Sequence, residues 1–554
     1  KRSTLAAKPK GDSGSSISSA GAPETVKGED AAKVALDNAK EWQRKKADAG
    51  FAAILWPKEF GGYGGTPIDQ VIYAQEEHDY FVHSGYFEIG IGMLGPTMMA
   101  WGKDEDKKRF LPKMITGEEV VFWTKQAREY RKIRDSEVVF VGYGIVAPEY
   151  NWNDYEGIDV KGKTVVILVN DPGFATGKLR LFNGRSMTYY GRWTYKFEEA
   201  ARQGAAAAIV IHEEEPAAYP WSVVENSWQG PQLDLQRDDL GADRVILEGW
   251  IRDSTLNDVL NFTGFNYDSL KEIALEKTFS AFPLRGLTLS SEIHNKVRYL
   301  QSHNIAAVKK GLTKPDEYIL FMAHWDHLGF MEGAQIGDDK IANGAVDNAT
   351  GVAAVLEFAK RFSEIETERS VMFLAVTLEE SGLLGSEYFA KYPPIDLSNI
   401  VAGFNYDAIL PTGLTNDMVV VGYGASELED LLEDELGKSG RYINPDPNPD
   451  KGYFYRSDHI SFAKRGVPVL YADGGFDLVD GGKEAGFIIE EQYRLDAYHG
   501  VADEYDESWN LDGLNQSIDV IFNISNELAN NSQWPNWYEG NEFKSIRDIS
   551  RSDK

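Results

Sequence analysis

Five short segments in the second half of the chain each carry a side chain that can bind a divalent metal ion. In chain order, the candidate ligands are His324, Asp347, Glu380, Asp407 and His499. Each lies at the end of a predicted strand or in the following loop, and loops at the carboxyl ends of neighbouring parallel strands converge on one crevice. Because the chain contains no cysteine, a metal ion must be held by histidines and carboxylates. This set suits a pair of zinc-type ions with one bridging carboxylate and a water molecule between them.

The adjacent residues Glu379 and Glu380 offer two different functions. One carboxylate can bind a metal ion while its neighbour, which points elsewhere, takes a proton from the activated water and returns it to a leaving amine. A Lewis acid, an activated water and a proton shuttle are what hydrolysis of a peptide bond requires. The pattern is therefore typical of metal-dependent hydrolysis, which needs no serine or cysteine nucleophile.

Predicted strands and helices alternate over the last part of the chain, as in a mostly parallel α/β sheet. Apolar runs predict strands over residues 318–323, 370–377, 400–406 and 467–471, and helical spacing predicts helices over 352–362 and 428–436. A middle region carries predicted strands over 137–144, 164–169 and 206–212 and a helical run over 195–204. The first region has helical spacing over 31–46, 69–79 and 104–113, with almost no strand signal.

The composition excludes several classes of protein. A net charge of −30 repels phosphate backbones and anionic lipid surfaces, so no nucleic acid is expected as a partner. The same charge predicts weaker binding of acidic substrates unless the local charge of the pocket outweighs it. The chain has no run of about 18 apolar residues, so no membrane span is expected. Residues 1–22 lack the apolar centre of a signal peptide.

The chain from about residue 120 onward resembles the zinc exopeptidase family that includes the bacterial co-catalytic dizinc aminopeptidases and glutamate carboxypeptidase. The matching segments are FMAHWDHLG, NGAVDNATGVAAVLEFA, AVTLEESGLLGSEYFA, GFNYDAI, SDHISFAKRGVPVLYADGG and YHGVADEYD. The resemblance implies that His324 and Asp407 bind one zinc ion. It implies that Glu380 and His499 bind the other and that Asp347 bridges the two.

The same resemblance implies roles for residues around the ligands. Glu379 corresponds to the general base, and Asp326 corresponds to a carboxylate that orients His324. Tyr498 corresponds to a hydroxyl that helps to hold the tetrahedral oxyanion. His327, close to the first ligand, is expected to support the ligands and not to be one of them.

Two further groups of residues are expected near the substrate. The first group is the adjacent trio Ser457, Asp458 and His459. Neighbours in sequence seldom assemble a catalytic triad, and the resemblance places this trio in the wall of the substrate pocket.

Residues 137–285 resemble the protease-associated domain that many such enzymes carry beside the active-site cleft, in the segments VFVGYGIVAPEYNWNDYEGIDVKGKTVVILVNDPG and YKFEEAARQGAAAAIVIHEEE. That domain shapes the substrate entrance in the family, which makes Arg185, Tyr189 and Arg192 candidates for its lining.

Residues 28–119 resemble an unrelated family, the N-terminal helical domain of acyl-CoA dehydrogenases. The matching segments are EWQRKKADAGFAAILWPKEFGGYGGTPIDQVIYAQEE and GIGMLGPTMMAWGKDEDKKRFLPKMITGEE. The match stops where the central β-domain of that family would begin, so no flavin is expected. The chain is therefore interpreted as a fusion joined near residues 117–121. In the peptidase family a leading helix and strands precede the protease-associated insertion. Their absence here predicts either apolar surface exposed on the sheet or a gap that the N-terminal helices must cover.

These patterns predict an α/β protein in five parts. A mostly parallel-sheet dizinc exopeptidase domain carries an inserted β-rich protease-associated domain and is preceded by an all-α segment. The expected boundaries are a disordered leader at 1–27, the helical segment at 28–119, a junction at 120–136, the protease-associated domain at 137–285 and the catalytic domain at 286–554.

The predicted function is that of a zinc-dependent exopeptidase with two Zn²⁺ ions. The leading hypothesis is an aminopeptidase that acts on peptides. A carboxypeptidase or dipeptidase of the same family stays open, as does a non-catalytic binding protein if the fused N-terminal segment disables the site. Retention of both His324 and Asp407 disfavours the single-zinc glutaminyl cyclases. The missing flavin-contacting parts disfavour an acyl-CoA enzyme.

Members of the peptidase family are commonly exported. A periplasmic or secreted location is therefore expected, although this sequence contains no signal peptide. No oligomeric state is predicted.

Overall fold

The computed structural model describes residues 42–43, 45–47, 49, 51–58, 62–78, 120–228, 231–261, 263–331, 339–472 and 474–552. The chain divides into two compact units, and the division along the chain falls between Val120 and Val121. The expected leader at 1–27 and the expected helix at 104–113 lie outside the described residues, and 31–46 is described only in part. Within the described ranges, no helix combines the length and the apolar character that crossing a membrane requires.

The described part of the smaller unit contains helix α2 (Pro67–His78), close to the predicted range 69–79. The start of α2 is fixed by a reciprocal pair of side chains. The Thr66 hydroxyl donates to the Asp69 carboxylate at 2.8 Å, and the Asp69 amide donates to the Thr66 hydroxyl oxygen at 3.4 Å. This arrangement satisfies amide groups that the first turn of a helix leaves without partners. Pro67 at the first helical position costs no hydrogen bond.

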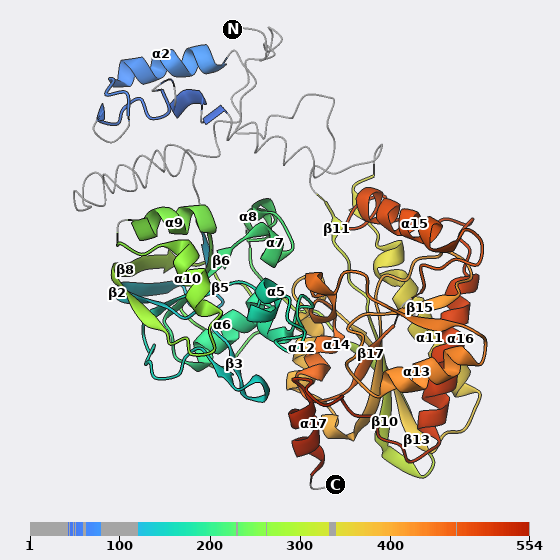
Figure 1. Ribbon diagram of the computed structural model, residues 1–554. Helices are drawn as coiled ribbons and strands as arrows, with labels where there is room; N and C mark the ends of the chain where they lie inside the picture. The colour runs from blue at the N-terminus through green and yellow to red at the C-terminus, as the bar shows by residue number, and fades with distance from the viewer. Residues whose placement is uncertain are drawn as a thin grey trace. The chain divides into compact units, whose positions relative to one another are not determined.

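The larger unit contains a six-stranded sheet in the order β1-β7-β6-β5-β2-β8 (Figure 1). Its strands are β1 (Val120–Trp123), β2 (Tyr130–Phe140), β5 (Thr164–Leu168), β6 (Ala207–His212), β7 (Leu247–Arg252) and β8 (Phe282–His294). Strands β2, β5, β6 and β7 run parallel, and β8 is antiparallel to β2. The short pair β3 (Val146–Ala147) and β4 (Trp152–Asn153) is separate from this sheet.

Helices cover both faces of the six-stranded sheet. Apolar residues of α6 (Trp193–Arg202) and α8 (Trp221–Ser227) pack on one face. Those of α9 (Asp253–Asn261) and α10 (Tyr267–Ala274) pack on the other. The short helices α5 (Pro172–Thr176) and α7 (Glu214–Ala217) lie in the same region of the chain. The region predicted to be β-rich therefore carries a sheet with helices on both faces.

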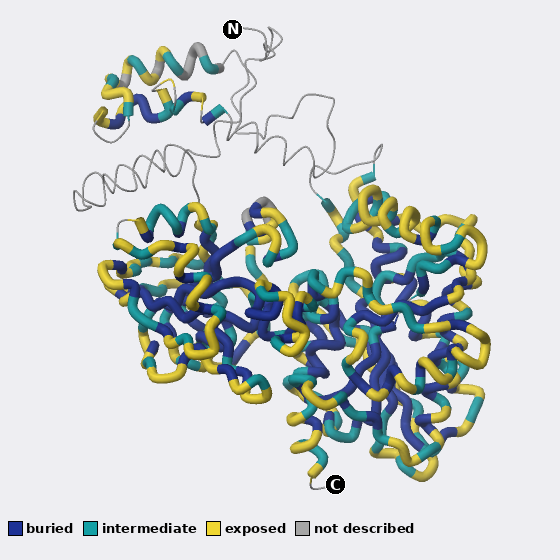
Figure 2. Tube along the Cα trace, in the orientation of Figure 1, coloured by how far each residue is buried: buried dark blue, intermediate teal, exposed yellow. Residues whose placement is uncertain are grey.

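A second sheet of five strands has the order β17-β14-β10-β13-β9. Its strands are β9 (Ile305–Lys309), β10 (Lys314–His324), β13 (Arg369–Val376), β14 (Ile400–Tyr406) and β17 (Val469–Tyr471). All are parallel except β9, which is antiparallel to β13. The predicted parallel strands are confirmed, and their nearly continuous burial is typical of a sheet covered on both faces. Figure 2 shows the buried centre of this part of the chain.

The helices around the second sheet form two layers. One face is covered by α11 (Gly351–Ser363), α13 (Leu428–Gly437) and α16 (Asp512–Ala529). The other face is covered by α12 (Leu384–Lys391) and α14 (His459–Ala463). The remaining elements are β11 (Gly329–Phe330), β12 (Ile341–Ala342), β15 (Asp417–Val420), β16 (Tyr442–Pro445), α15 (Gly482–Asp496) and α17 (Lys544–Arg551).

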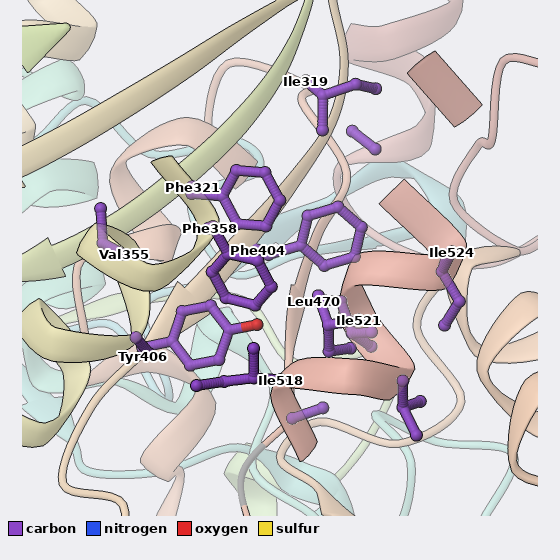
Figure 3. Close-up of a cluster of buried hydrophobic side chains, with 14 of the residues drawn as sticks. Ile319, Phe321, Val355, Phe358, Phe404, Tyr406, Leu470, Ile518, Ile521 and Ile524 are labelled. Atoms are coloured by element: carbon purple, nitrogen blue, oxygen red, sulfur yellow. The ribbon is translucent and has the colours of Figure 1, made fainter. Parts of the chain in front are cut away.

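Aromatic rings fill the space between the second sheet and α11 (Figure 3). Phe321 of β10 stacks on Phe358 of α11 with ring centroids 4.4 Å apart, and on Phe404 of β14 at 5.4 Å. The same cluster contains Ile518 and Ile521 of α16. This packing fixes α11, and so the loop that precedes it, against the central strands.

The register of the parallel strands brings their carboxyl ends to one edge. His324, the last residue of β10, lies opposite Val376, the last residue of β13. Ala323 lies opposite Tyr406, the last residue of β14. The segments that follow these three strands therefore begin side by side, as the candidate metal site requires.

We expect Phe358→Ala to lower the free energy of unfolding by about 3–5 kcal/mol, because it leaves a cavity under Phe321. Leu356→Ala on the same helix is the matched control, since Leu356 is 65% exposed. Urea unfolding followed by circular dichroism measures both. Equal losses in the two variants would contradict the packing described for α11.

Candidate metal centre

Four of the five candidate ligands lie where the sequence predicts them. His324 ends β10, Glu380 lies in the turn after β13, and Asp407 directly follows β14. Asp347 lies in the segment that follows strand β12, which also agrees with the expectation of a strand end or following loop, whereas the expectation is wrong for His499. Asp347 lies in an irregular helical turn, Ala345–Thr350, between β12 and α11, and His499 follows helix α15.

The structure brings all five side chains together. The Nε2 atom of His324 lies 3.1 Å from an Asp407 oxygen and 3.2 Å from Oδ1 of Asp347. The Nε2 atom of His499 lies 3.2 Å from Oδ2 of Asp347 and 3.2 Å from an oxygen of Glu380. Asp347 is therefore central, with one carboxylate oxygen toward each histidine.

These distances fit two zinc ions. Ligand atoms about 2.0 Å from a tetrahedral zinc ion lie about 3.3 Å from one another, and the four donor separations are 3.1–3.2 Å. Charge leads to the same conclusion. Three carboxylates in a largely buried cluster repel one another unless cations lie between them. Two divalent ions carry four positive charges and would more than offset the three negative charges.

The electrostatics of the protein alone also favour positive charge at this point. Burial opposes protonation of His324, but the charge of Asp407 and hydrogen bonds to Asp347 and Asp407 raise the pKa of this histidine well above its ordinary value. Burial alone would raise the pKa of Asp347, yet hydrogen bonds from His324 and His499 lower it. The cluster thus stabilises an anionic carboxylate beside a cation.

Asp326 holds two ligand segments together. Its backbone carbonyl oxygen lies 3.0 Å from Nδ1 of His324, whereas its carboxylate is 3.9 Å from that nitrogen. The carboxylate instead accepts the backbone N–H groups of Glu379 at 3.1 Å and Glu380 at 3.4 Å. Asp326 therefore contacts His324 through its main chain and the glutamate pair through its side chain.

Two residues that the sequence reasoning missed act in the same way. Asp503 is buried, and its carboxylate accepts the backbone N–H groups of Val346 at 2.8 Å and Asp347 at 3.0 Å. Asn348 donates to the carbonyl of Tyr406 at 2.8 Å and accepts the N–H of Ala408 at 3.2 Å. The signal was available, because Asp503 lies in the quoted segment YHGVADEYD and Asn348 lies in NGAVDNATG.

His327 also faces the cluster. Its Nδ1 atom lies 2.8 Å from Oε1 of Glu380, and His327, Asp347 and Glu380 form a second group with converging donor atoms. A separation of 2.8 Å is short for two ligands of one zinc ion, for which about 3.3 Å is expected. The two atoms lie at ion-pair distance without forming a hydrogen bond, so His327 is interpreted as a neighbour of Glu380 and His499 stays the candidate ligand.

A cavity of about 790 Å³ opens on the cluster, and Asp347, Glu379, Glu380, Asp407 and His499 line it. Burial and the neighbouring charge of Asp407 raise the pKa of Glu379 well above its usual value. Tyr498 lines the cavity as well, and its ring stacks on that of His499 with centroids 3.9 Å apart.

The expected substrate-binding residues divide into two sets. Ser457, Tyr189 and Arg192 line the cavity. Asp458 and His459 are fully buried and are not among its lining residues. Arg185 does not line the cavity either, because it is exposed and pairs with Glu215 at 2.7 Å.

Two segments of the chain match known families. Residues 304–525 match peptidase family M28, and residues 22–118 match the N-terminal domain of acyl-CoA dehydrogenases. Both resemblances found in the sequence are thereby confirmed. The protease-associated assignment of residues 137–285 stays a prediction.

Individual relatives match shorter stretches. A probable zinc metalloprotease of Pyrenophora tritici-repentis (strain Pt-1C-BFP) is 36% identical over 105 residues, which are 19% of this chain and 24% of that protein. Aminopeptidase YwaD of Bacillus subtilis (strain 168) is 29% identical over 111 residues, 20% of this chain and 22% of that protein. Acyl-CoA dehydrogenase FadE29 of Mycobacterium tuberculosis (strain ATCC 25618 / H37Rv) is 28% identical over 170 residues, 26% and 43% of the two chains. The chain thus spans less than half the length of each of these relatives.

Among solved structures, the aminopeptidase from Aneurinibacillus sp. strain AM-1 is similar with a TM-score of 0.38 and 20% identity. The alignment covers 75% of this chain and 79% of that one.

We expect Asp503→Asn to weaken zinc binding about tenfold to a hundredfold, because the amide can no longer accept both N–H groups that position Asp347. Titration with zinc against a coloured chelator measures the affinity without relying on catalysis. Asp506→Asn is the control, since Asp506 is exposed three residues away. An unchanged zinc affinity in folded Asp503→Asn protein would contradict this role.

The zinc content of two variants distinguishes whether His499 or His327 is the metal ligand beside Glu380. We expect His499→Ala to remove about one zinc ion per chain, because it deletes a ligand. His327→Ala should keep two, because it deletes only a contact to a ligand. Atomic emission spectroscopy of dialysed protein measures the stoichiometry, and the reverse pattern would make His327 the ligand.

Proposed function

We propose that this chain is a zinc-dependent exopeptidase, most simply an aminopeptidase, that holds two Zn²⁺ ions. The observation that carries the proposal is the spacing of 3.1–3.2 Å between donors on both sides of Asp347, at the mouth of a cavity that Glu379 also lines. The match of residues 304–525 to a peptidase family supports the reaction class.

The ligand assignment follows the donor contacts. His324 and Asp407 would hold one ion and Glu380 and His499 the other, with Asp347 as the carboxylate that both would share. Zinc bound there supplies a Lewis acid for the scissile carbonyl and lowers the pKa of water.

The chain's own residues supply the rest of the chemistry. Glu379, which lines the cavity beside its ligand neighbour Glu380, accepts a proton from the attacking water and delivers it to the nitrogen of the leaving amine. The Tyr498 hydroxyl, beside His499, donates a hydrogen bond to the oxygen that becomes negative in the transition state. Asp326 holds the turn that carries both glutamates.

The part of the chain that carries the six-stranded sheet contributes to the same cavity. Tyr189 and Arg192 line it together with the metal cluster. The Tyr189 hydroxyl and the Lys464 ammonium both contact Glu198, at 2.5 and 2.7 Å, which fixes this side of the wall. We propose that residues 137–285 act as a protease-associated domain that limits the length of the substrate, and that the protein works in the periplasm or outside the cell.

We expect Glu379→Gln to lower kcat about 10²–10⁴-fold with bound zinc unchanged, because a proton carrier and not a ligand is lost. Steady-state kinetics and atomic emission on the same preparation measure both quantities. Glu364→Gln is the matched control, since Glu364 is exposed and directly follows α11. A large loss of zinc in Glu379→Gln would show that the ligand and the base of the pair are exchanged.

The function itself is tested with unblocked aminoacyl-nitroanilides, the same compounds with acetylated amino groups, and peptides blocked only at the amino terminus. Cleavage of only the unblocked compounds, lost on chelation and restored by zinc, is the expected result. Cleavage of amino-blocked peptides at their last bond would instead establish a carboxypeptidase. A folded, zinc-loaded protein that cleaves none of them would overturn the proposal in favour of a binding protein.

A further inference from the structure

Arg192 is a buried cation without a charged partner. It is 8% exposed and immediately precedes α6, and its Nε atom has no hydrogen-bond acceptor within the described ranges. No carboxylate of the described residues lies within ion-pair distance of its guanidinium. Burying a charge without a partner costs free energy. An anion bound beside Arg192 would reduce this cost.

Arg456 lies on the same cavity and shares this property. Its Nε and Nη2 atoms are buried and also lack a described acceptor. Burial and the like charge of Arg456 together lower the pKa of Arg192 to about 10. Both guanidinium groups thus line one cavity, and the positive charge of Arg456 acts on Arg192.

Two other cations of the cavity wall have carboxylate partners. Lys464 donates to Glu198 at 2.7 Å, and the Arg244 guanidinium lies 3.9 Å from Asp234. Arg192 and Arg456 differ from these two because their described partners are aromatic rings, with ring centroids at 5.8 Å (Trp193) and 5.4 Å (Tyr453). Arg456 directly precedes Ser457, whose hydroxyl accepts from Asn405 of β14 at 2.8 Å. Because Asp407 follows two residues after Asn405, this wall is tied to the strand that carries a candidate ligand.

We propose that Arg192 and Arg456 form a carboxylate-binding subsite in the cavity that opens on the metal cluster. Guanidinium groups match the two oxygens of a carboxylate, and such pairs are strong when water is excluded. The preferred substrates are then short peptides with a carboxylate close to the scissile bond, either a free carboxyl terminus or an aspartate or glutamate side chain. The net charge of −30 by itself disfavours such substrates, so the preference requires that the two guanidinium groups outweigh it at the subsite.

This inference rests on the proposed exopeptidase function for its kinetic test. One arm compares Leu-Ala with Leu-Ala amide, which differ in the terminal carboxylate. A second arm compares Leu-Glu amide with Leu-Gln amide, which differ in the side-chain carboxylate. At least one carboxylate peptide is expected to have a kcat/KM about tenfold to a hundredfold above its neutral partner, from charge-assisted hydrogen bonds.

Variants assign the preference to the two arginines. Arg192→Gln and Arg456→Gln should each reduce the discrimination by about tenfold, and Arg456→Lys should reduce it less, because charge is kept while the planar fork is lost. Arg185→Gln is the control, since Arg185 is exposed and does not line the cavity. Circular dichroism and zinc content verify that each variant is folded.

A binding measurement separates this inference from the proposed function. Calorimetry with zinc-loaded Glu379→Gln protein, with and without Arg456→Gln, measures the affinity of the same four peptides without turnover. Arginine-dependent preference for a carboxylate peptide supports the subsite even if the wild type hydrolyses nothing. Hydrolysis without a carboxylate preference, together with equal affinities for charged and neutral peptides, overturns the subsite and leaves the peptidase intact.

Discussion

The candidate metal centre depends on holding three carboxylates close together in spite of their mutual repulsion. Asp347, Glu380 and Asp407 approach two histidines in a largely buried cluster. Cations reduce this repulsion once bound, but the chain must place the ligands before binding. The parallel register of β10, β13 and β14 brings three of the ligand segments to one edge of the sheet. Side-chain hydrogen bonds to the main chain then fix the segments relative to one another.

Those hydrogen bonds follow one pattern. The Asp326 carboxylate accepts two consecutive N–H groups at the glutamate pair, and the Asp503 carboxylate accepts two consecutive N–H groups ending at Asp347. The backbone beside the ligands is strained as well, because Leu378, Ala408 and His499 all have positive φ angles of 56–57°. Each such residue costs about 1 kcal/mol or more. The buried hydrogen bonds offset this strain, which explains why acidic residues that bind no metal accompany the ligands.

Much of this arrangement could be predicted from the sequence, because parallel strands convert chain order into spatial proximity. The strands that end at His324 and before Asp407 are apolar runs, and their carboxyl ends meet by topology alone. The site of His499 could not be derived in this way, since it follows a helix, α15. Side-chain direction was also beyond the sequence. Asp326 was expected to hold His324 through its carboxylate, and Arg185 was expected near the substrate, yet both side chains turn to other partners.

The fusion near residue 120 affects the second sheet at its edge and not at its centre. The ligand-bearing strands β10, β13 and β14 are the three central strands, and β9 lies outside them. The apolar surface predicted from the missing lead-in is present on β9, where Ile305 is 61% exposed and Val308 is 45% exposed. An exposed edge strand with apolar side chains promotes association between chains, but β9 carries none of the candidate ligands. An exposed edge of this kind therefore bears on association between chains more directly than on the candidate metal centre.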